Sequence, residues 1–264
     1  MPTPFVRASR QSPGLRSLAL LIVTALFFSA CSTATGPQAD TASFSYLALG
    51  DSYTIGASVD PADRWPEQLM DLAASAGSDS NTETPDRSAI AVSYVATNGW
   101  TTQSLLGSLR ASPPRQARYD LVTLLIGVNN QFRGWDFGVY EQDVPELFDI
   151  ALEYVGQDAS RMIVVSIPDY AYTPYGERRG SSVRQAISTE LDQYNNWMQT
   201  YAASRGVSYV YITDITRRGL EEPDLVADDE LHPSGTAYAE FAARILEQHP
   251  DILAPDVDSV ASLP

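Results

Sequence analysis

Five short apolar runs, separated by stretches with helical periodicity, are the feature that most constrains the fold of this chain. The runs cover residues 44–49, 91–96, 121–126, 162–167 and 207–212. The third and fourth are almost wholly apolar, as expected for parallel strands that are covered on both faces. Strands that alternate with helices form an open, doubly wound sheet. We therefore predict an α/β fold of three layers, α/β/α, around a five-stranded parallel sheet.

Helical patterns occupy the intervening segments. Residues 181–204 place apolar side chains, Val183 among them, on one face at steps of three and four. Asp143-Val144-Pro145-Glu146 is typical of a capped helix start, and this helix is predicted to end near Gly156. A last helix is predicted over residues 233–248.

The length of 264 residues suits one sizeable α/β domain. We place this domain at residues 44–249. Residues 31–43 are small and polar and are predicted to form a flexible tether. Residues 250–264 are rich in Pro and Asp and are predicted to form a loose tail.

Polar residues follow each predicted strand at its carboxyl end, where open α/β sheets place their chemistry. In chain order they are Gly50-Asp51-Ser52, Asn98-Gly99, Gly127-Val128-Asn129-Asn130, Pro168-Asp169 and the loop Asp228-Asp229-Glu230-Leu231-His232. Each group alone also suits an ordinary turn, because Gly, Asp, Asn and Ser favour turns. Their common position predicts a shared crevice.

A serine nucleophile needs a base, and the chain has only two histidines. His249 stands at the end of the last predicted helix and is predicted to be a surface residue. His232 stands at the other end of that helix, three residues after Asp229, which can hold its imidazole in one tautomer. Asp228 is a competitor for this orienting role. The sequence thus favours Ser52, His232 and Asp229 as a catalytic triad.

A tetrahedral intermediate also needs hydrogen-bond donors aimed at its oxyanion. The candidates are the backbone N–H groups of Ser52 and Gly99 and the side-chain amide of Asn129. Gly99 and Asn129 are equally typical of turns when each is taken alone.

These four blocks resemble those of the SGNH, or GDSL, hydrolase superfamily. The blocks are Gly50-Asp51-Ser52, Gly99, Gly127-x-Asn129 and Asp229-x-x-His232, and the resemblance covers residues 44–248. It implies a flavodoxin-like sheet of order 2-1-3-4-5 and ester hydrolysis without a metal or other cofactor. It also implies the roles given above: Ser52 as nucleophile, His232 as base, Asp229 as orienting acid, and an oxyanion hole of Ser52, Gly99 and Asn129. Many members have Asp after the third-block Asn, whereas this chain has Asn130.

Composition excludes several other functions. The net charge is −16, which argues against nucleic acid and against electrostatic binding to anionic lipid. All 17 basic residues are Arg, so no lysine is available for a Schiff base or a P-loop. The sequence has no Gly-x-Ser-x-Gly elbow, no Gly-x-Gly-x-x-Gly after the first strand and no His/Cys cluster for zinc. We therefore expect no metal and no cofactor, and the resemblance implies a small-molecule ester as the partner.

The N-terminus is predicted to be an export signal over residues 1–30. Basic residues precede an apolar segment at 18–28, which is too short to span a bilayer. Cys31, the only cysteine, ends a stretch that resembles a bacterial lipobox, and lipidation there would anchor the protein in the cell envelope. Cleavage after Ala34 is the alternative, and the protein would then be secreted. Membrane contact is expected through the N-terminal lipid only.

The substrate is the least determined property. Tyr170, Tyr172, Tyr175 and the Trp100 region are candidates for a pocket beside Ser52. The first hypothesis is a serine esterase acting on lipid, lysophospholipid or small acyl esters. The alternatives are a carbohydrate acetylesterase and a catalytically silent surface lipoprotein that keeps the fold as a binding module.

Overall fold

A parallel sheet forms the centre of the fold in the computed structural model, which describes residues 43–78 and 85–253. Its strands are β1 (Phe44–Gly50), β2 (Ile90–Ala96), β3 (Leu121–Leu125), β4 (Met162–Val165) and β5 (Ser208–Val210). All neighbouring pairs are parallel, and the order is β2-β1-β3-β4-β5. The predicted fold class and strand order are confirmed.

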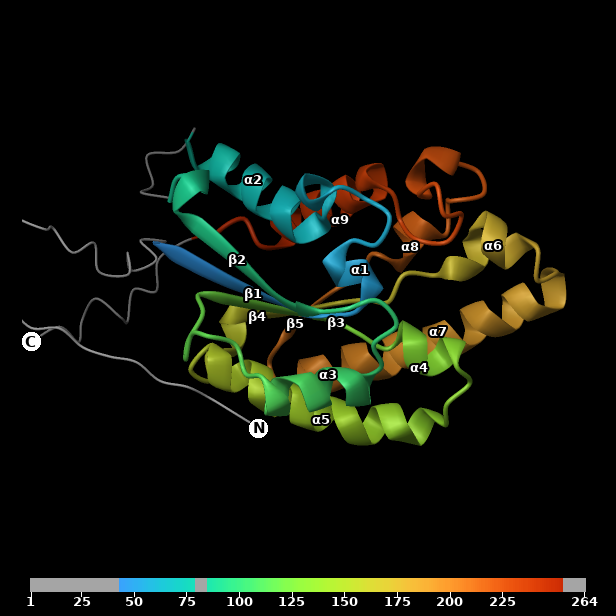
Figure 1. Cartoon of the computed structure of the whole chain (residues 1–264), viewed down its shortest axis with the longest axis horizontal. Helices are drawn as coiled ribbons and strands as arrows, with labels where there is room; N and C mark the ends of the chain where they lie inside the picture. Colours follow the sequence, from blue (N-terminus) through green and yellow to red (C-terminus); the bar gives the residue numbers. More distant parts are fainter. Residues whose placement is uncertain (1–42, 79–84, 254–264) are drawn as a thin grey trace, which may run out of the picture. The chain divides into compact units, whose positions relative to one another are not determined.

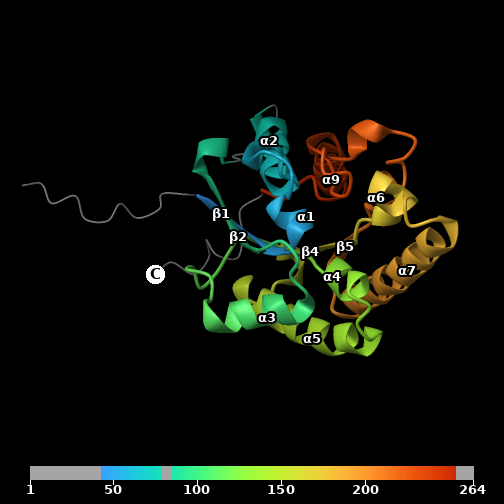
Figure 2. The same ribbon diagram turned by 45° about the vertical axis from the view of Figure 1, so that its right-hand side comes forward.

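Helices cover both faces of this sheet (Figure 1). The long helices α2 (Trp65–Ser78) and α9 (Gly235–Gln248) pack together on one face, side by side in both views (Figure 2). The other face carries α3 (Thr102–Ala111), α5 (Phe137–Tyr154) and α7 (Ser181–Ser204). Every residue of β3 and β4 is buried, because both faces of these strands are covered.

Short helical turns connect the larger elements. Four are α-helical: α1 (Ser52–Ile55), α4 (Val128–Phe132), α6 (Pro174–Glu177) and α8 (Thr213–Thr216). Five are 3₁₀ turns: Pro61–Asp63, Arg87–Ala89, Ala159–Arg161, Tyr170–Tyr172 and Pro223–Leu225. Both α1 and α4 begin directly beyond the carboxyl end of a strand, so the sheet delivers their first residues to one edge.

The helix predicted to begin at Asp143 is longer than expected. It begins at Phe137, where the Asp136 side chain accepts the Gly138 N–H, and Pro145 lies inside it. A proline there leaves the carbonyl of Glu141 without its helical donor, and Glu141 is exposed, so water can reach this turn. Pro145 was the misleading signal, since it also favours the first turn of a helix.

The other helical predictions hold, with differences at the ends. Helix α7 has the predicted bounds, but Val183 is exposed because the first turn of α7 extends beyond the core. Helix α9 begins at Gly235, with the Ser234 side chain as its cap. The packed chain extends past the predicted boundary at residue 249, because Ile252 and Leu253 are buried.

The export signal at 1–30, Cys31 and almost all of the tether lie outside the described residues. Most of the predicted tail does too. Within the described ranges, no helix is long and apolar enough to cross a membrane.

Candidate active site

Ser52 lies at the carboxyl end of β1, the second strand in the sheet order. The chain turns sharply at Gly50, where a Cβ atom would collide with Thr54 Oγ1 and with the Leu125 carbonyl. Ser52 then opens α1, so its backbone N–H has no acceptor within the helix. The Ser52 residue is only 5% exposed. The fold thus holds this serine in a tight turn beside the ends of β2 and β3.

Asp51 caps α1 and is fully buried. Its Oδ1 accepts the Tyr53 N–H at 3.0 Å. The Asn129 amide and the Gly127 N–H lie close enough to lower the pKa of Asp51, but neither completes a hydrogen bond to Oδ2. Burial outweighs these contacts and raises the pKa of Asp51 to about 7. Asp51 therefore supports the turn and does not contact a histidine.

Asp229 and His232 form a close pair in the loop before α9. Asp229 Oδ2 lies 2.5 Å from His232 Nδ1, while Oδ1 accepts the backbone N–H groups of Leu231 and His232 at 3.0 and 2.9 Å. Burial raises the pKa of Asp229, but the hydrogen bonds from Ser58, His232 and Leu231 outweigh it and lower the value to about 2. A carboxylate that is ionised across the working pH range therefore faces His232 Nδ1.

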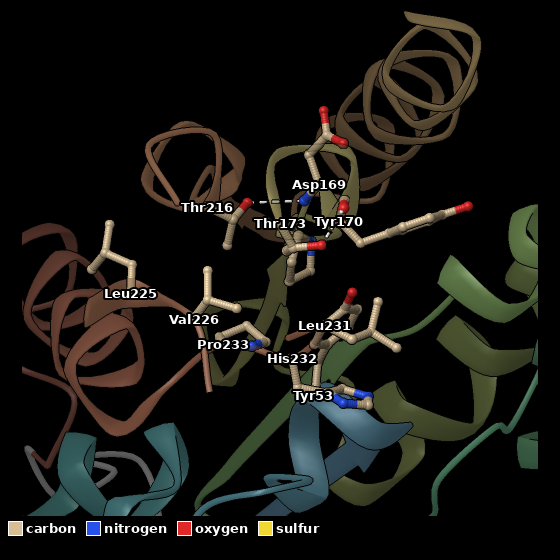
Figure 3. Close-up of a pocket in the computed structure, with 11 residues that line it drawn as sticks. Tyr53, Asp169, Tyr170, Thr173, Thr216, Leu225, Val226, Leu231, His232 and Pro233 are labelled. Carbon is tan, nitrogen blue, oxygen red and sulfur yellow. Dashed lines mark hydrogen bonds between the residues drawn. The ribbon is translucent and has the colours of Figure 1, made fainter. Parts of the chain in front are cut away.

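His232 is placed beside α1 by an aromatic contact. The rings of Tyr53 and His232 meet edge to face, with centroids 5.6 Å apart and an interplanar angle of 66°. Figure 3 shows both side chains at the same side of a small cavity, opposite Asp169 and Tyr170. Because Tyr53 directly follows Ser52, this contact brings the imidazole to the segment that carries the serine.

Two of the three candidate oxyanion donors lie beyond the carboxyl ends of the strands that flank β1. Gly99 follows β2 with a φ of +77°, and its carbonyl accepts from Arg133 at 2.6 Å. Asn129 lies in α4 after β3, and its side-chain amide donates to the Trp100 carbonyl at 3.0 Å. One hydrogen of the Asn129 amide is thus engaged, which sets the amide plane and leaves the other hydrogen to donate elsewhere.

Asn130 has a structural contact network that the sequence does not reveal. It is fully buried, its Oδ1 accepts the Thr102 N–H at 3.0 Å, and its Nδ2 donates to Thr102 Oγ1 at 2.8 Å. Thr102 Oγ1 in turn donates to Asp143 at 2.6 Å. Asn130 therefore links α4 to the first turn of α3 and, through Thr102, to α5.

His249 lies at the other end of the sheet. It caps α9, and its Nε2 lies 2.8 Å from the hydroxyl of Ser208, the first residue of β5. It is half-buried, contrary to the predicted surface position, and burial lowers its pKa. The packing of the chain end against the sheet explains this burial, since Ile252 and Leu253 follow closely.

An aromatic groove lies next to α4, between α6 and α7. We call it the Phe132 groove; it is lined by Gln131, Phe132, Tyr170, Tyr175, Val183 and Ile187, with Arg179 and Glu190 at its polar side. Its volume is about 440 Å³. Two of its apolar side chains are unusually open, Phe132 at 48% and Val183 at 41% exposure. Of the aromatic residues predicted to line a pocket beside Ser52, Tyr170 and Tyr175 line this groove, whereas Trp100 does not and Tyr172 lies under Arg184.

The small cavity beside His232 differs sharply from this groove. Its volume is about 10 Å³, which fits a single water, and its lining combines apolar side chains such as Leu225, Val226 and Leu231 with polar ones such as Asp169 and His232. Over the described ranges, no group of three or more His, Cys, Asp or Glu side chains is arranged to hold a metal ion.

One contact of the Asp229–His232 pair was missed by sequence reasoning. Ser58, in the loop after α1, donates its hydroxyl to Asp229 Oδ2 at 2.6 Å. Nothing in the sequence pattern distinguishes this serine, because its partner is 171 residues away.

Comparison with known proteins agrees with the architecture. The sequence model described as "GDSL-like Lipase/Acylhydrolase family" matches residues 48–240. No curated protein matches the chain.

Solved structures with this fold include several bacterial hydrolases. The lipase/acylhydrolase from Enterococcus faecalis is 19% identical, with a TM-score of 0.58 over 81% of this chain and 98% of that one. A lipolytic protein of the G-D-S-L family from Veillonella parvula is 15% identical, with a TM-score of 0.56 over 77% and 96%. An acetylxylan esterase from Geobacillus stearothermophilus is 17% identical, with a TM-score of 0.55 over 82% and 97%. Identities this low establish likeness of fold alone.

Proposed function

The chain belongs to the GDSL-like lipase/acylhydrolase family, and from this premise we propose that it is a serine esterase that hydrolyses carboxylic esters through Ser52, His232 and Asp229. The observation that carries the proposal is the 2.5 Å contact between Asp229 and His232, beside the turn that holds Ser52. A buried serine at a strand end and an acid-bound imidazole are the two parts that acyl transfer to water requires.

The proposed reaction has two steps. His232 donates Nδ1–H to Asp229, so Nε2 is its basic nitrogen and takes the Ser52 proton as the hydroxyl attacks the ester carbonyl. The oxyanion accepts from the N–H groups of Ser52 and Gly99 and from the Asn129 side-chain amide. The tetrahedral intermediate collapses, His232 protonates the leaving alcohol, and Ser52 keeps the acyl group. Water, activated by His232, then releases the acid and restores Ser52.

The Phe132 groove favours a substrate that carries an apolar group. It adjoins α4, which carries Asn129, and its exposed aromatic and aliphatic side chains remove apolar surface from water when a ligand binds. The water-sized cavity beside His232 has no room for such a group. Lipid, lysophospholipid and small acyl esters therefore remain the first substrate class. Aromatic faces also stack on sugars, so an acetylated carbohydrate is the second candidate.

A covalent probe tests the assignment directly. We expect a fluorophosphonate to label the wild type and not Ser52→Ala, with unchanged thermal unfolding. Ser208→Ala is the matched control, because Ser208 also contacts a histidine but lies at the opposite end of the sheet. Labelling that survives in Ser52→Ala, or is lost in Ser208→Ala, would refute the proposed nucleophile. A folded wild type that is never labelled would favour the silent binding module.

A panel of esters with rising acyl length addresses the substrate. Hydrolysis that rises with chain length supports an acyl or lipid ester, whereas release of acetate from acetylated sugars alone would select the carbohydrate acetylesterase. Phe132→Ala should weaken binding of the longer esters only, as a rise in KM. An equal rise in KM for acetate esters would show that the Phe132 groove does not bind the longer acyl group.

We also propose that Cys31 is lipidated and anchors the protein in the bacterial cell envelope. The lipobox-like end of the apolar segment supports this, since lipidation needs a cysteine at this place. The full-length protein should pellet with membranes, and Cys31→Ser should release it to the soluble fraction. If the full-length protein and Cys31→Ser distribute equally between the membrane and soluble fractions, the proposed lipid anchor is refuted.

A further inference from the structure

Ser58 shares an oxygen of Asp229 with the catalytic histidine. Its Oγ lies 2.6 Å from Oδ2, the same atom that lies 2.5 Å from His232 Nδ1. Oδ1 is occupied by two backbone N–H groups of its own loop. Ser58 therefore contacts this carboxylate from a segment far away in the sequence and helps to set its orientation.

The loop that carries Ser58 is closely tied to the nucleophile. Ser58 lies six positions after Ser52, and the N–H groups of Gly56 and Ala57 both donate to the Ser52 carbonyl. Ser58 itself has a φ of +66°, a conformation that residues with a side chain rarely adopt. A backbone in this state costs free energy and persists only where the surrounding structure holds it. From this conformation the Ser58 hydroxyl donates to Asp229.

Two side-chain contacts join the Ser52 segment to the loop of Asp229 and His232. One is the edge-to-face packing of Tyr53 on His232, and the other is the Ser58–Asp229 hydrogen bond. Ring packing leaves an imidazole free to slide and tilt, whereas a hydrogen bond to the acid fixes a direction. Asp229 is about one-third exposed at its side chain, so water would replace the hydroxyl without restoring that direction.

We propose that Ser58 is a positioning residue, which clamps the carboxylate of Asp229 to the segment carrying Ser52 and so aligns His232 for proton transfer. The proposal rests on the esterase function proposed above. Ser58 does not line the Phe132 groove, so its removal should change kcat and leave KM unaltered. The pKa of Asp229 agrees with this role, since the Ser58 hydrogen bond is the largest of the contacts that lower it.

Ser58→Gly is the variant that separates positioning from structural support. Glycine adopts the positive φ without strain, so this variant should unfold at the same temperature as the wild type or higher. We expect kcat to fall about 10- to 100-fold, the effect of a small misplacement of a catalytic group. Gln157→Gly is the matched control, because Gln157 also has a positive φ, of 69°, and lies outside the site. It should be equally stable and fully active.

The proton between His232 and Asp229 supplies a second readout. A short Nδ1–H···O hydrogen bond gives a far-downfield proton NMR signal, which Asp229→Asn should abolish. We expect Ser58→Gly to shift this signal and Gln157→Gly to leave it in place. An unshifted signal with kcat within about twofold of the wild type would overturn the proposal, as would a loss of kcat that only follows a loss of stability. If the wild type hydrolyses no ester, the proposed function fails, and the NMR signal still decides whether Ser58 holds the pair.

Discussion

Asp51 offers a quantitative prediction, because it is a carboxyl group with no exposed surface directly before the proposed nucleophile. Burial raises its pKa from 3.8 to about 7 in the folded protein, against the lowering effect of the Tyr53 N–H. In the unfolded chain the pKa returns to its ordinary value. Between these two values the folded state holds a proton that the unfolded state has lost, so stability falls as pH rises.

The size of the effect follows from the two pKa values. Below the unfolded value of 3.8 the stabilisation is fully present, and it is lost as pH rises through about 7. Each pH unit in this window is worth about 1.4 kcal/mol, so the whole window amounts to about 4 kcal/mol and the part from pH 5 to pH 7 to about 3 kcal/mol. Asp51→Asn cannot ionise, and this slope should disappear from its stability profile.

Urea unfolding at a series of pH values measures the slope. Asn keeps the capping oxygen for the Tyr53 N–H, but its NH₂ group would face the Asn129 amide and the Gly127 N–H, which are donors themselves. This mismatch lowers the free energy of unfolding by about 1–3 kcal/mol at every pH, so it does not change the slope with pH. Asp229→Asn is the matched control, because the pKa of Asp229 is lowered to about 2. In the wild type, the stability that Asp229 contributes is full above its ordinary pKa and is lost only as pH falls towards 2. Asp229→Asn should therefore lower stability by a constant amount between pH 5 and pH 7 and leave the slope there unchanged. An unchanged slope between pH 5 and pH 7 in Asp51→Asn would refute the reasoning.

Three further predictions test the surroundings of the site. Asn129→Asp removes the proposed oxyanion donor and should lower kcat about 10²- to 10³-fold; because it also leaves the Trp100 carbonyl without its donor, thermal stability should fall as well, and a kcat loss below about tenfold would exclude Asn129 from the oxyanion hole. Asn130→Asp leaves Thr102 Oγ1 without a donor and sets two carboxylates against one hydroxyl, so urea unfolding at neutral pH should show a loss of about 1–3 kcal/mol that shrinks in acid. Gly127→Ala would place a Cβ 2.6 Å from Tyr140 Cε2 and should lower the free energy of unfolding by about 3 kcal/mol. Gly107→Ala, which has open space around it in α3, should be neutral or stabilising. Equal melting temperatures for the two variants would contradict the steric argument.

Much of the fold is readable from local pattern. Apolar runs of six residues predict all five strands, and the pattern is strongest at β3 and β4, because a strand covered on both faces has no need for polar residues. The bounds of α7 follow from its helical spacing. The start of α5 does not, since Pro145 is tolerated inside a helix whose neighbouring turn faces water.

The candidate site, like the fold, could be predicted from the sequence only in part. Its chemical residues stand out in the sequence, because Ser52 follows a strand, the chain has only two histidines, and Asp229 lies within reach of one of them along the chain. The geometry that surrounds them does not stand out. The burial of Asp51, the Ser58 contact with Asp229 and the Asn130–Thr102 link all join segments far apart in sequence or depend on what packs above them.

The sequence by itself therefore determined the strands, the helices α5, α7 and α9 apart from some of their ends, and the list of candidate reactive side chains, because these depend on neighbours along the chain. The strand order is not contained in local pattern: the family resemblance implied it, and the tertiary structure shows β1 between β2 and β3, with Gly99 and Asn129 following those two strands. The tertiary structure also decided that Asp229 faces His232 Nδ1 and Ser58 together. The physical reason is that periodicity and turn preference act over a few residues, whereas burial, pKa and hydrogen-bond direction depend on every element that packs around a group.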